Sequence, residues 1–340
     1  MPPLDAHRRP LGSLRLSVTD RCNLRCRYCM PGDHHEWLPR AEILRFDELR
    51  ALVDAFVALG VERVRITGGE PLLRRDLPKL VALLARNAGI ADLALTTNGV
   101  LLGPQARALR SAGLGRVTVS LDTLRPERFA ALTRVDALGA VRAGIDAALG
   151  AGLGPVKLDA VILRGVNDDE LADLLELGWA LGIEVRFIEY MAIGSASRWS
   201  REQVVEAATM LATIAERYGE PTPFGGRGAS PAERYRLPDG RTFGIIAANS
   251  APFCAKCNRS RLTADGTWYP CLYATRGLDL KAPLRAGRSA AELEALLAQA
   301  WQARTDRGAE ERAAARDRAT QCGLPPPAAG AGLAMHSRGG

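Results

Sequence analysis

The stretch LRLSVTD, residues 14–20, opens a series of six short segments in which β-branched and aliphatic residues dominate. The other five are RVRITGG (63–69), LALTTNG (93–99), RVTVSLD (116–122), VKLDAVI (156–162) and EVRFIEYM (184–191). Between these segments apolar residues recur at helical spacing, as Leu49, Leu52 and Phe56 do before Gly60. Strands that alternate with helices predict a parallel sheet wrapped by helices. The alternation stops near residue 195, so we predict an α/β fold, an incomplete (β/α)6 TIM-like barrel with a C-terminal region covering its open side.

The chain beyond residue 195 differs in composition from the part before it. We predict three regions: a partial barrel over 1–195, a C-terminal region over 196–325, and a tail rich in Gly and Pro over 326–340. Residues 222–244 are rich in Gly and Pro and predict a loop. The segments TFGIIAAN (242–249) and RLTADGTWYPCLY (261–273) predict strands, the second with Asp265-Gly266 as a hairpin turn.

Two aspartates precede apolar stretches that have helical periodicity. Asp76 comes before a stretch with Leu80 and Leu84 on one face, and Asp168 comes before Leu171 and Leu175. A short acidic side chain can accept hydrogen bonds from the first N–H groups of a helix, so we expect both aspartates to act as N-caps.

Composition excludes several classes of protein. Of 340 residues, 47% are hydrophobic, and no window holds the eighteen or so apolar residues of a membrane span. The N-terminal residues lack the apolar core of a signal peptide, so we expect a cytoplasmic protein with no membrane partner. Seven cysteines are too few for a disulfide framework in a chain of this length, which favours metal or catalytic roles. The net charge of +7 reflects abundant arginine, and we do not expect nucleic acid as a partner.

The segment CNLRCRYC (22–29) follows the first predicted strand and carries three cysteines, Cys22, Cys26 and Cys29. A structural zinc site usually has four protein ligands, and no fourth cysteine follows. Three thiolates can bind three irons of a [4Fe–4S] cluster and leave the fourth iron open to a small molecule. Zinc with His34 or His35 as the fourth ligand is one alternative, and three unrelated buried cysteines are another.

This loop resembles the signature of the radical S-adenosylmethionine enzymes, with Tyr28 as the aromatic residue before the third cysteine. The segment TGGEP (67–71), after the second predicted strand, resembles the glycine-rich edge that contacts the methionyl amino group in that superfamily. The resemblance implies that the amino and carboxylate groups of S-adenosylmethionine bind the open iron. It also implies that reduction of the cluster cleaves the sulfonium to a 5'-deoxyadenosyl radical.

A second set of three cysteines, Cys254, Cys257 and Cys271, lies in the C-terminal region. Alone, this set is ambiguous between a zinc ribbon and an auxiliary cluster, but next to the first loop it favours a second [4Fe–4S] cluster with an open iron. Cys322 stands among prolines and has no assigned role. Arg259 and Arg261 follow in CNRSRL, where two residues of an extended segment share a face and suit a phosphate or a carbonyl edge. Two solvated surface arginines are the alternative.

Together these motifs resemble one family, the GTP 3',8-cyclases of molybdenum cofactor biosynthesis. The resemblance runs from LRLSVTDRCNLRCRYCMP through RITGGEPLLRRDL, LTTNG, VSLD and RFIEYM to FCAKCNRSRLTADGTWYPCL, and includes the terminal Gly339-Gly340. It implies a lyase with two [4Fe–4S] clusters, S-adenosylmethionine as cofactor and GTP as substrate. The product would be (8S)-3',8-cyclo-7,8-dihydroguanosine 5'-triphosphate, formed by hydrogen abstraction from C3' and attack on C8 of guanine.

The resemblance also implies roles for particular residues. The first cluster would be held by Cys22, Cys26 and Cys29, and the second by Cys254, Cys257 and Cys271. S-adenosylmethionine would be bound by Tyr28, Gly69, Ser120 and Met191. GTP would be bound by Arg15, Arg65, Thr96, Lys157, Arg259, the backbone at Ser260, and Arg261, with Arg259 and Arg261 also serving catalysis. Arg15 and Lys157 lie within predicted strands, where a buried charge is costly unless it is paired, and this itself argues for an anionic ligand.

Several partners and alternatives follow from the same resemblance. We expect an electron-donor protein, a downstream cyclic pyranopterin monophosphate synthase that uses the product, and an insertion of the Gly339-Gly340 end into the active site. A homodimer is compatible with the sequence but not indicated by it. The alternatives are another radical S-adenosylmethionine enzyme with an auxiliary cluster, such as a peptide-modifying maturase, and a zinc-stabilised nucleic-acid-binding protein.

Overall fold

The structure is a computed structural model that describes residues 2–30, 36–193 and 199–321. All six predicted strands of the first part are present and run parallel in chain order. They are β1 (Ser13–Ser17), β2 (Arg63–Thr67), β3 (Asp92–Thr97), β4 (Arg116–Ser120), β5 (Lys157–Ile162) and β6 (Glu184–Glu189). Most end two residues or so before the predicted boundary, because the chain leaves the sheet at glycines and polar residues that form the loops.

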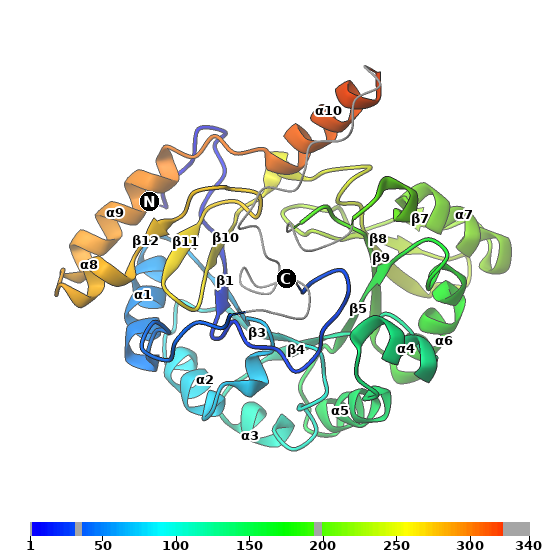
Figure 1. Cartoon of the computed structure of the whole chain (residues 1–340), viewed down its shortest axis with the longest axis horizontal. Coiled ribbons are helices and arrows are strands. Elements are labelled where there is room, and N and C mark those ends of the chain that lie inside the picture. The colour runs from blue at the N-terminus through cyan, green and yellow to red at the C-terminus, as the bar shows by residue number, and fades with distance from the viewer. Residues whose placement is uncertain (1, 31–35, 194–198, 322–340) are drawn as a thin grey trace.

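The helices lie along the outer side of the curved sheet (Figure 1). The α-helices are α1 (Phe46–Ala58), α2 (Leu77–Ala85), α3 (Ala106–Ser111), α4 (Pro126–Thr133), α5 (Leu138–Gly150), α6 (Leu171–Leu181), α7 (Ala207–Tyr218), α8 (Lys281–Arg285), α9 (Ala290–Gln302) and α10 (Gly308–Gln321). Short 3₁₀ turns are η1 (Pro71–Leu73), η2 (Asp168–Glu170), η3 (Arg201–Gln203) and η4 (Cys254–Lys256). No helix among the described residues is long and apolar enough to cross a bilayer.

The C-terminal region extends the sheet at both edges. Its strands are β7 (Thr222–Pro223), β8 (Glu233–Arg236), β9 (Thr242–Ile246), β10 (Arg259–Leu262), β11 (Thr267–Tyr269) and β12 (Leu278–Asp279). The strand order is β12-β11-β10-β1-β2-β3-β4-β5-β6-β9-β8-β7, with β10 parallel to β1 and β9 parallel to β6. The sheet does not close, so the prediction of an incomplete (β/α)6 barrel is confirmed. The strands on both sides of the predicted boundary at residue 195 belong to one sheet, and the three predicted regions stay a prediction.

Some local predictions were wrong. Residues 222–244 are not all loop, because β7 and β8 form there. Strand β8 pairs antiparallel with β7 on one side and with β9 on the other. Arg234 and Arg236 of β8 are exposed, and both stack on Phe224. Neither predicted aspartate caps its helix. Asp76 has left-handed backbone (φ 61°) and makes no capping hydrogen bond, and Asp168 accepts instead from the Gly165 N–H at 2.9 Å.

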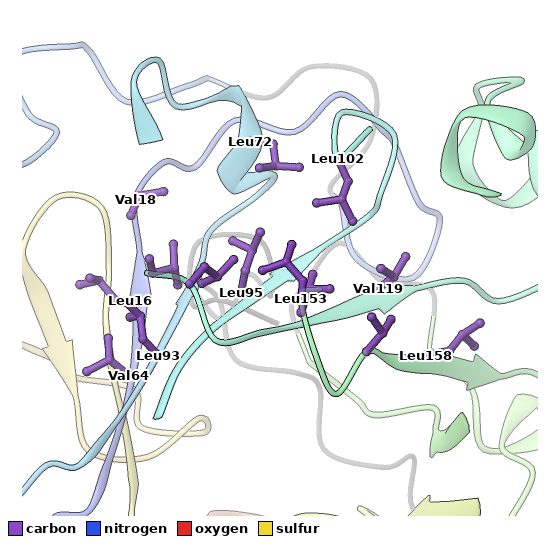
Figure 2. Packing of buried hydrophobic residues seen from close by; sticks show 14 of the residues in the cluster. Leu16, Val18, Val64, Leu72, Leu93, Leu95, Leu102, Val119, Leu153 and Leu158 are labelled. Carbon is purple, nitrogen blue, oxygen red and sulfur yellow. The ribbon is translucent and has the colours of Figure 1, made fainter. Parts of the chain in front are cut away.

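The two faces of the parallel strands differ in chemistry. On the helix side, Leu16, Val64, Leu95, Val119 and Leu158 are almost completely buried and pack into one core (Figure 2). The register aligns polar residues on the opposite face: Arg261, Arg15 and Arg65 in one row, Thr96 beside Thr118, and Asp159 beside Arg186. Barrel interiors are usually filled by branched apolar side chains. A polar interior therefore indicates a ligand cavity and not a packed centre.

Helix α5 packs on the turn after β3 through Gly144. A Cβ atom at Gly144 would overlap the carbonyl oxygen of Gly99, which is backbone and cannot move aside, whereas a Cβ at Gly139 of the same helix meets no atom within 4 Å. The helix thus approaches the sheet at a distance that only glycine allows.

We predict that Gly144→Ala destabilises the protein by about 1–3 kcal/mol through overpacking, although alanine is the better helix former. Gly139→Ala, the matched control, should be neutral or stabilise by up to about 1 kcal/mol. Thermal unfolding of both variants measures the difference. Equal melting temperatures would contradict the close approach of α5.

Candidate active site

The first cysteine loop follows β1 and is held by backbone hydrogen bonds. Cys29 N–H and Met30 N–H both donate to the Cys26 carbonyl at 3.0 Å, which closes a tight turn. Arg25 N–H donates to Thr133 O at 2.9 Å at the end of α4. The loop therefore has a defined shape although it contains no helix or strand.

The segment TGGEP (67–71) is hydrogen-bonded to the residues that lead into this loop. Gly69 N–H donates to Thr19 O at 2.9 Å, and Glu70 N–H donates to Arg21 O at 2.7 Å. A Cβ at Gly69 would lie 2.5 Å from Asp20 O, and closer to Arg21 O, so no other residue fits. The Gly-Gly pair is thus required for the approach of two backbones immediately before Cys22.

The thiols of this loop lie near one another and are poorly solvated. Burial, then the neighbouring Cys29, raises the pKa of Cys26 well above its usual value. Burial, then Cys22, raises the pKa of Cys29 to about 12. Three clustered thiols that resist ionisation alone suit a positively charged iron group, since a bound metal deprotonates its thiol ligands. In the described residues, no three His, Cys, Asp or Glu side chains lie close enough to share a single metal ion.

Tyr28 of the loop points to the end of β4. Its hydroxyl donates to Asp122 Oδ2 at 2.6 Å, and Asp122 Oδ1 accepts from the Val161 N–H at 2.9 Å. The Tyr28 ring makes an edge contact with Tyr190, with ring centroids 6.4 Å apart. The loop, β4, β5 and β6 are therefore tied together around Tyr28.

The second cysteine set lies on η4 and on the segment after β11. Cys257 N–H donates to Cys254 O at 3.1 Å. Burial alone would raise the pKa of Cys257, but the Arg259 guanidinium lowers it to about 6. Arg259 also stacks on Phe253 at 4.7 Å, and its buried Nε has no hydrogen-bond partner among the described residues. Both observations suit a site prepared for a metal group and a further ligand.

A row of three guanidiniums, of which Arg261 is buried and Arg15 and Arg65 are partly buried, crosses the interior between these two loops. Arg261, Arg15 and Arg65 are register neighbours on β10, β1 and β2. Burial, then Arg261 and Arg65, lowers the pKa of Arg15 well below its usual value, while Asp159 opposes this effect. Burial, then Arg116, lowers the pKa of Arg65 to about 10. Like charges held together at this cost favour an anionic ligand.

Strand pairing explains how the two loops face one cavity. Arg259, two residues after Cys257, pairs with Ser13 at the start of β1, whereas Cys22 follows the other end of β1. The five residues of β1 span about 13 Å from end to end, at roughly 3.3 Å per step, and one loop lies at each end of this strand. The guanidinium row lies between them.

Most predicted site residues line one cavity of about 250 Å³. These are Arg15, Cys22, Cys26, Tyr28, Cys29, Gly69, Thr96, Ser120, Met191, Cys254, Cys257, Arg259, Arg261 and Cys271. Three do not line it. Arg65 stands behind Thr96 and donates to the hydroxyls of Thr96 and Thr118 at 3.0 Å, Lys157 donates to Glu184 Oε1 at 3.1 Å, and the Ser260 side chain is buried. His34, His35, Cys322 and Gly339-Gly340 lie outside the described residues.

Sequence reasoning left several cavity residues without a role. Asp122 and Asn98 stand at strand ends, and this position indicated that they could belong to a site. Their partners Tyr28 and Cys22 are far away in the chain and could not be predicted. Asp159 lines the cavity with a buried Oδ1 that has no hydrogen-bond partner in the described part of the chain. Arg304 also lines the cavity, and no local pattern marks it.

Comparison with known proteins gives the family. The Radical SAM superfamily matches residues 16–178, and Molybdenum Cofactor Synthesis C matches residues 183–310. GTP 3',8-cyclase 1 of Mycobacterium tuberculosis is 51% identical over 99% of this chain and 95% of its own length. The chain belongs to the GTP 3',8-cyclase family. The family's enzyme of Acidothermus cellulolyticus is 49% identical over 92% of this chain and 89% of its own.

Solved structures support the fold alone. Streptococcus suis SuiB bound to S-adenosylmethionine has a TM-score of 0.60 at 14% identity, covering 98% of this chain and 74% of that one. The protein anSMEcpe with bound AdoMet has a TM-score of 0.54 at 15% identity, covering 78% and 73%. The chain therefore shares its fold with more distant proteins that were solved with S-adenosylmethionine bound.

The side chain of Glu70 should make the stability of the folded chain depend on pH. It is fully buried, accepts from Leu72 N–H at 3.0 Å, Thr97 Oγ1–H at 2.7 Å and Asn98 N–H at 2.8 Å, and burial raises its pKa to about 7. A carboxyl whose pKa is higher in the folded chain binds its proton more tightly there. The contribution of this carboxyl to the free energy of unfolding is therefore present at low pH and is lost as the pH rises through 7.

We predict that Glu70→Gln destabilises the metal-free chain by about 1–3 kcal/mol, because an amide NH₂ would face a backbone N–H donor. Glutamine does not titrate, so the stability gap between wild type and variant should narrow from pH 5 to pH 7.5. Urea unfolding at both pH values measures the gap. A gap that widens with pH would contradict the raised pKa.

Proposed function

We propose that this protein is a radical S-adenosylmethionine lyase that converts GTP to (8S)-3',8-cyclo-7,8-dihydroguanosine 5'-triphosphate in molybdenum cofactor biosynthesis. The observation that carries the proposal is the arrangement of two three-cysteine loops at the two ends of β1, with Arg15 and Arg261 of the guanidinium row between them in one cavity. Identity near 50% to GTP 3',8-cyclases over almost the whole chain supports the same activity.

The residues present fit two [4Fe–4S] clusters, each with three thiolate ligands. Cys22, Cys26 and Cys29 would hold the first, and Cys254, Cys257 and Cys271 the second. When bound, the first cluster and S-adenosylmethionine supply a 5'-deoxyadenosyl radical that removes hydrogen from C3' of GTP. Tyr28, Gly69, Ser120 and Met191 are the proposed contacts of S-adenosylmethionine, because all four line the same cavity as the first cysteine loop.

The arginines would bind and orient the nucleotide. A triphosphate carries a charge near −4, and each close cation is worth on the order of a few kcal/mol in a partly buried site before desolvation. Arg15 and Arg261 would contact it directly, with Thr96 beside them. Arg65 would act through Thr96, to which it donates, and Lys157 must leave Glu184 if it contacts GTP. Arg259, with its unpartnered Nε beside Cys257, would orient the guanine or phosphate end. Fixing both reactants matters because a reactive radical must meet one hydrogen.

The remaining partners are proposals of the same kind. We propose an electron-donor protein for reduction, a cyclic pyranopterin monophosphate synthase that uses the product, and insertion of the Gly339-Gly340 end into the site. A cytoplasmic location is proposed because GTP and reduced thiols occur there. A homodimer remains a hypothesis. A peptide-modifying maturase and a zinc-stabilised nucleic-acid-binding protein are both disfavoured by membership of the cyclase family.

We predict that the reconstituted protein, supplied with reductant, S-adenosylmethionine and GTP deuterated at C3', transfers deuterium to 5'-deoxyadenosine. Anaerobic turnover followed by mass spectrometry measures the transfer. Unlabelled 5'-deoxyadenosine that forms equally without GTP would keep the superfamily and remove GTP as the substrate.

We predict that Arg259→Ala lowers kcat/KM for GTP roughly 100-fold, since a charge-assisted hydrogen bond contributes about 1.5–3 kcal/mol, while iron content stays at the wild-type value. Arg227→Ala is the matched control. Arg227 stacks on the same Phe253 ring at 4.5 Å but does not line the cavity, so its loss should change kcat/KM little. If iron is lost together with activity in Arg259→Ala, the arginine supports the cluster instead of the substrate.

A further inference from the structure

The segment before β1 folds back on the second cysteine loop. Leu4 and Pro10 form a β-bridge, and between them Asp5 and Arg9 are 5% and 3% exposed. Arg304, just after α9, is 4% exposed and lies against them. Charged side chains are almost never buried to this degree unless they are paired.

The three side chains form one ion network. Arg9 Nε donates to Asp5 Oδ2 at 2.6 Å, and Arg304 Nη1 donates to the same oxygen at 3.2 Å. Asp5 Oδ1 accepts from the backbone N–H groups of His7 and Arg9, both at 2.9 Å. Trp301 packs against this network. Its indole N–H donates to Arg9 O at 3.0 Å, and the guanidinium carbon of Arg304 lies 4.5 Å from the centre of its ring.

One Nη group of each guanidinium also donates to the backbone of a proposed ligand of the second cluster. Arg9 Nη1 donates to Cys254 O at 2.8 Å, and Arg304 Nη1 donates to Cys257 O at 3.0 Å. Arg9 Nη2 donates to Asp306 O at 2.9 Å. Two of the three cysteines are thus fixed through their carbonyls to arginines that share one carboxylate.

Stability alone does not explain this network. A buried ion pair or triad is weak evidence for stability, because apolar residues of the same volume often stabilise as well. An apolar replacement would leave the carbonyls of Cys254 and Cys257 without these donors. The loop has only the short η4 turn as regular structure, so its geometry depends on contacts from outside.

We infer that Asp5, Arg9 and Arg304 are positioning residues of the second cluster, which fix the Cys254–Cys257 loop and set the charge behind it. The inference rests on the proposed second cluster. It predicts that the sign of a charge change at the network appears in the reduction potential of that cluster. Withdrawal of a positive charge disfavours an added electron, and withdrawal of a negative charge favours it.

The test uses the full chain with Cys22, Cys26 and Cys29 changed to Ser, so that bound iron reports on the second cluster alone. In this background we compare Arg304→Gln, Arg304→Lys, Arg9→Gln and Asp5→Asn. Iron and sulfide content, the electron paramagnetic resonance of the reduced protein, and the midpoint potential are measured anaerobically, with circular dichroism as a check on folding. Arg128→Gln is the control, because Arg128 pairs with buried Glu170, far along the chain from this loop.

We expect Arg304→Gln and Arg9→Gln to lose at least half of the iron and to shift the potential of the remainder to more negative values. Asp5→Asn should shift the midpoint potential to more positive values. Arg304→Lys keeps the positive charge, so its potential should stay closer to that of the triple cysteine variant. Its altered geometry should still change the electron paramagnetic resonance spectrum. Asp5→Asn and Arg304→Lys are mild enough to test the idea if a glutamine variant does not fold. Arg128→Gln should change none of these quantities.

The inference would be overturned if folded Arg304→Gln and Asp5→Asn had the same iron content, resonance spectrum and midpoint potential as the triple cysteine variant. Midpoint potentials that shift in the same direction in Arg304→Gln and in Asp5→Asn would also overturn the inference. A merely structural role would not depend on the sign of the charge that is removed. A background protein that binds no iron would instead overturn the proposed second cluster and the function built on it.

Discussion

The backbone of residues 19–21 rests directly on Gly68 and Gly69, and the site depends on this contact. It joins the end of β1 to the end of β2 through hydrogen bonds from Gly69 and Glu70, with no room for a side chain at Gly69. Because Cys22 follows immediately, the contact sets where the first cysteine loop begins. Glu70 then connects the same edge to β3 through Thr97 and Asn98, and Asn98 in turn lies beside Cys22. One close approach of two backbones thus orders three strand ends around the loop.

The second constraint is the polar face of the sheet. Leucines and valines bury one face of each parallel strand against the helices, and this stabilises the sheet without any help from its interior. The interior carries Arg15, Arg65 and Arg261, and burial together with neighbouring arginines lowers the pKa of Arg15 and of Arg65. A closed barrel fills its centre with side chains, whereas the open sheet of this chain leaves a cavity of about 250 Å³.

Much of this could be predicted from the sequence. The six strands are evident because each has a regular apolar face, and the cysteine spacings and TGGEP indicate the chemistry of the loops. The positions of β9 and β10 on opposite sides of the six parallel strands could not be predicted, since both depend on pairing with strands far away in the chain. Strands β7 and β8 were missed because residues 222–244 have the composition of a loop. The predicted cap at Asp76 was wrong because N-cap residues usually have extended backbone, whereas Asp76 is left-handed and its carboxylate pairs with Lys79 at 3.4 Å. The contact between Asp5 and Arg304 spans 299 positions in the chain and leaves no local pattern.

The pairing of β10 with β1 unites these observations. Because the two strands are parallel and in register from Ser13, a loop that ends just before β10 must lie at the opposite end of β1 from the loop that follows β1. The two cysteine sets are therefore separated by the length of one strand, and Arg15 and Arg261 stand side by side midway between them. A cavity of this length, charged in its middle and with one cysteine set at each end, suits a substrate that is long, anionic and held at both ends. GTP has these properties, and the sheet register, more than any single residue, explains why one chain can present both loops to it.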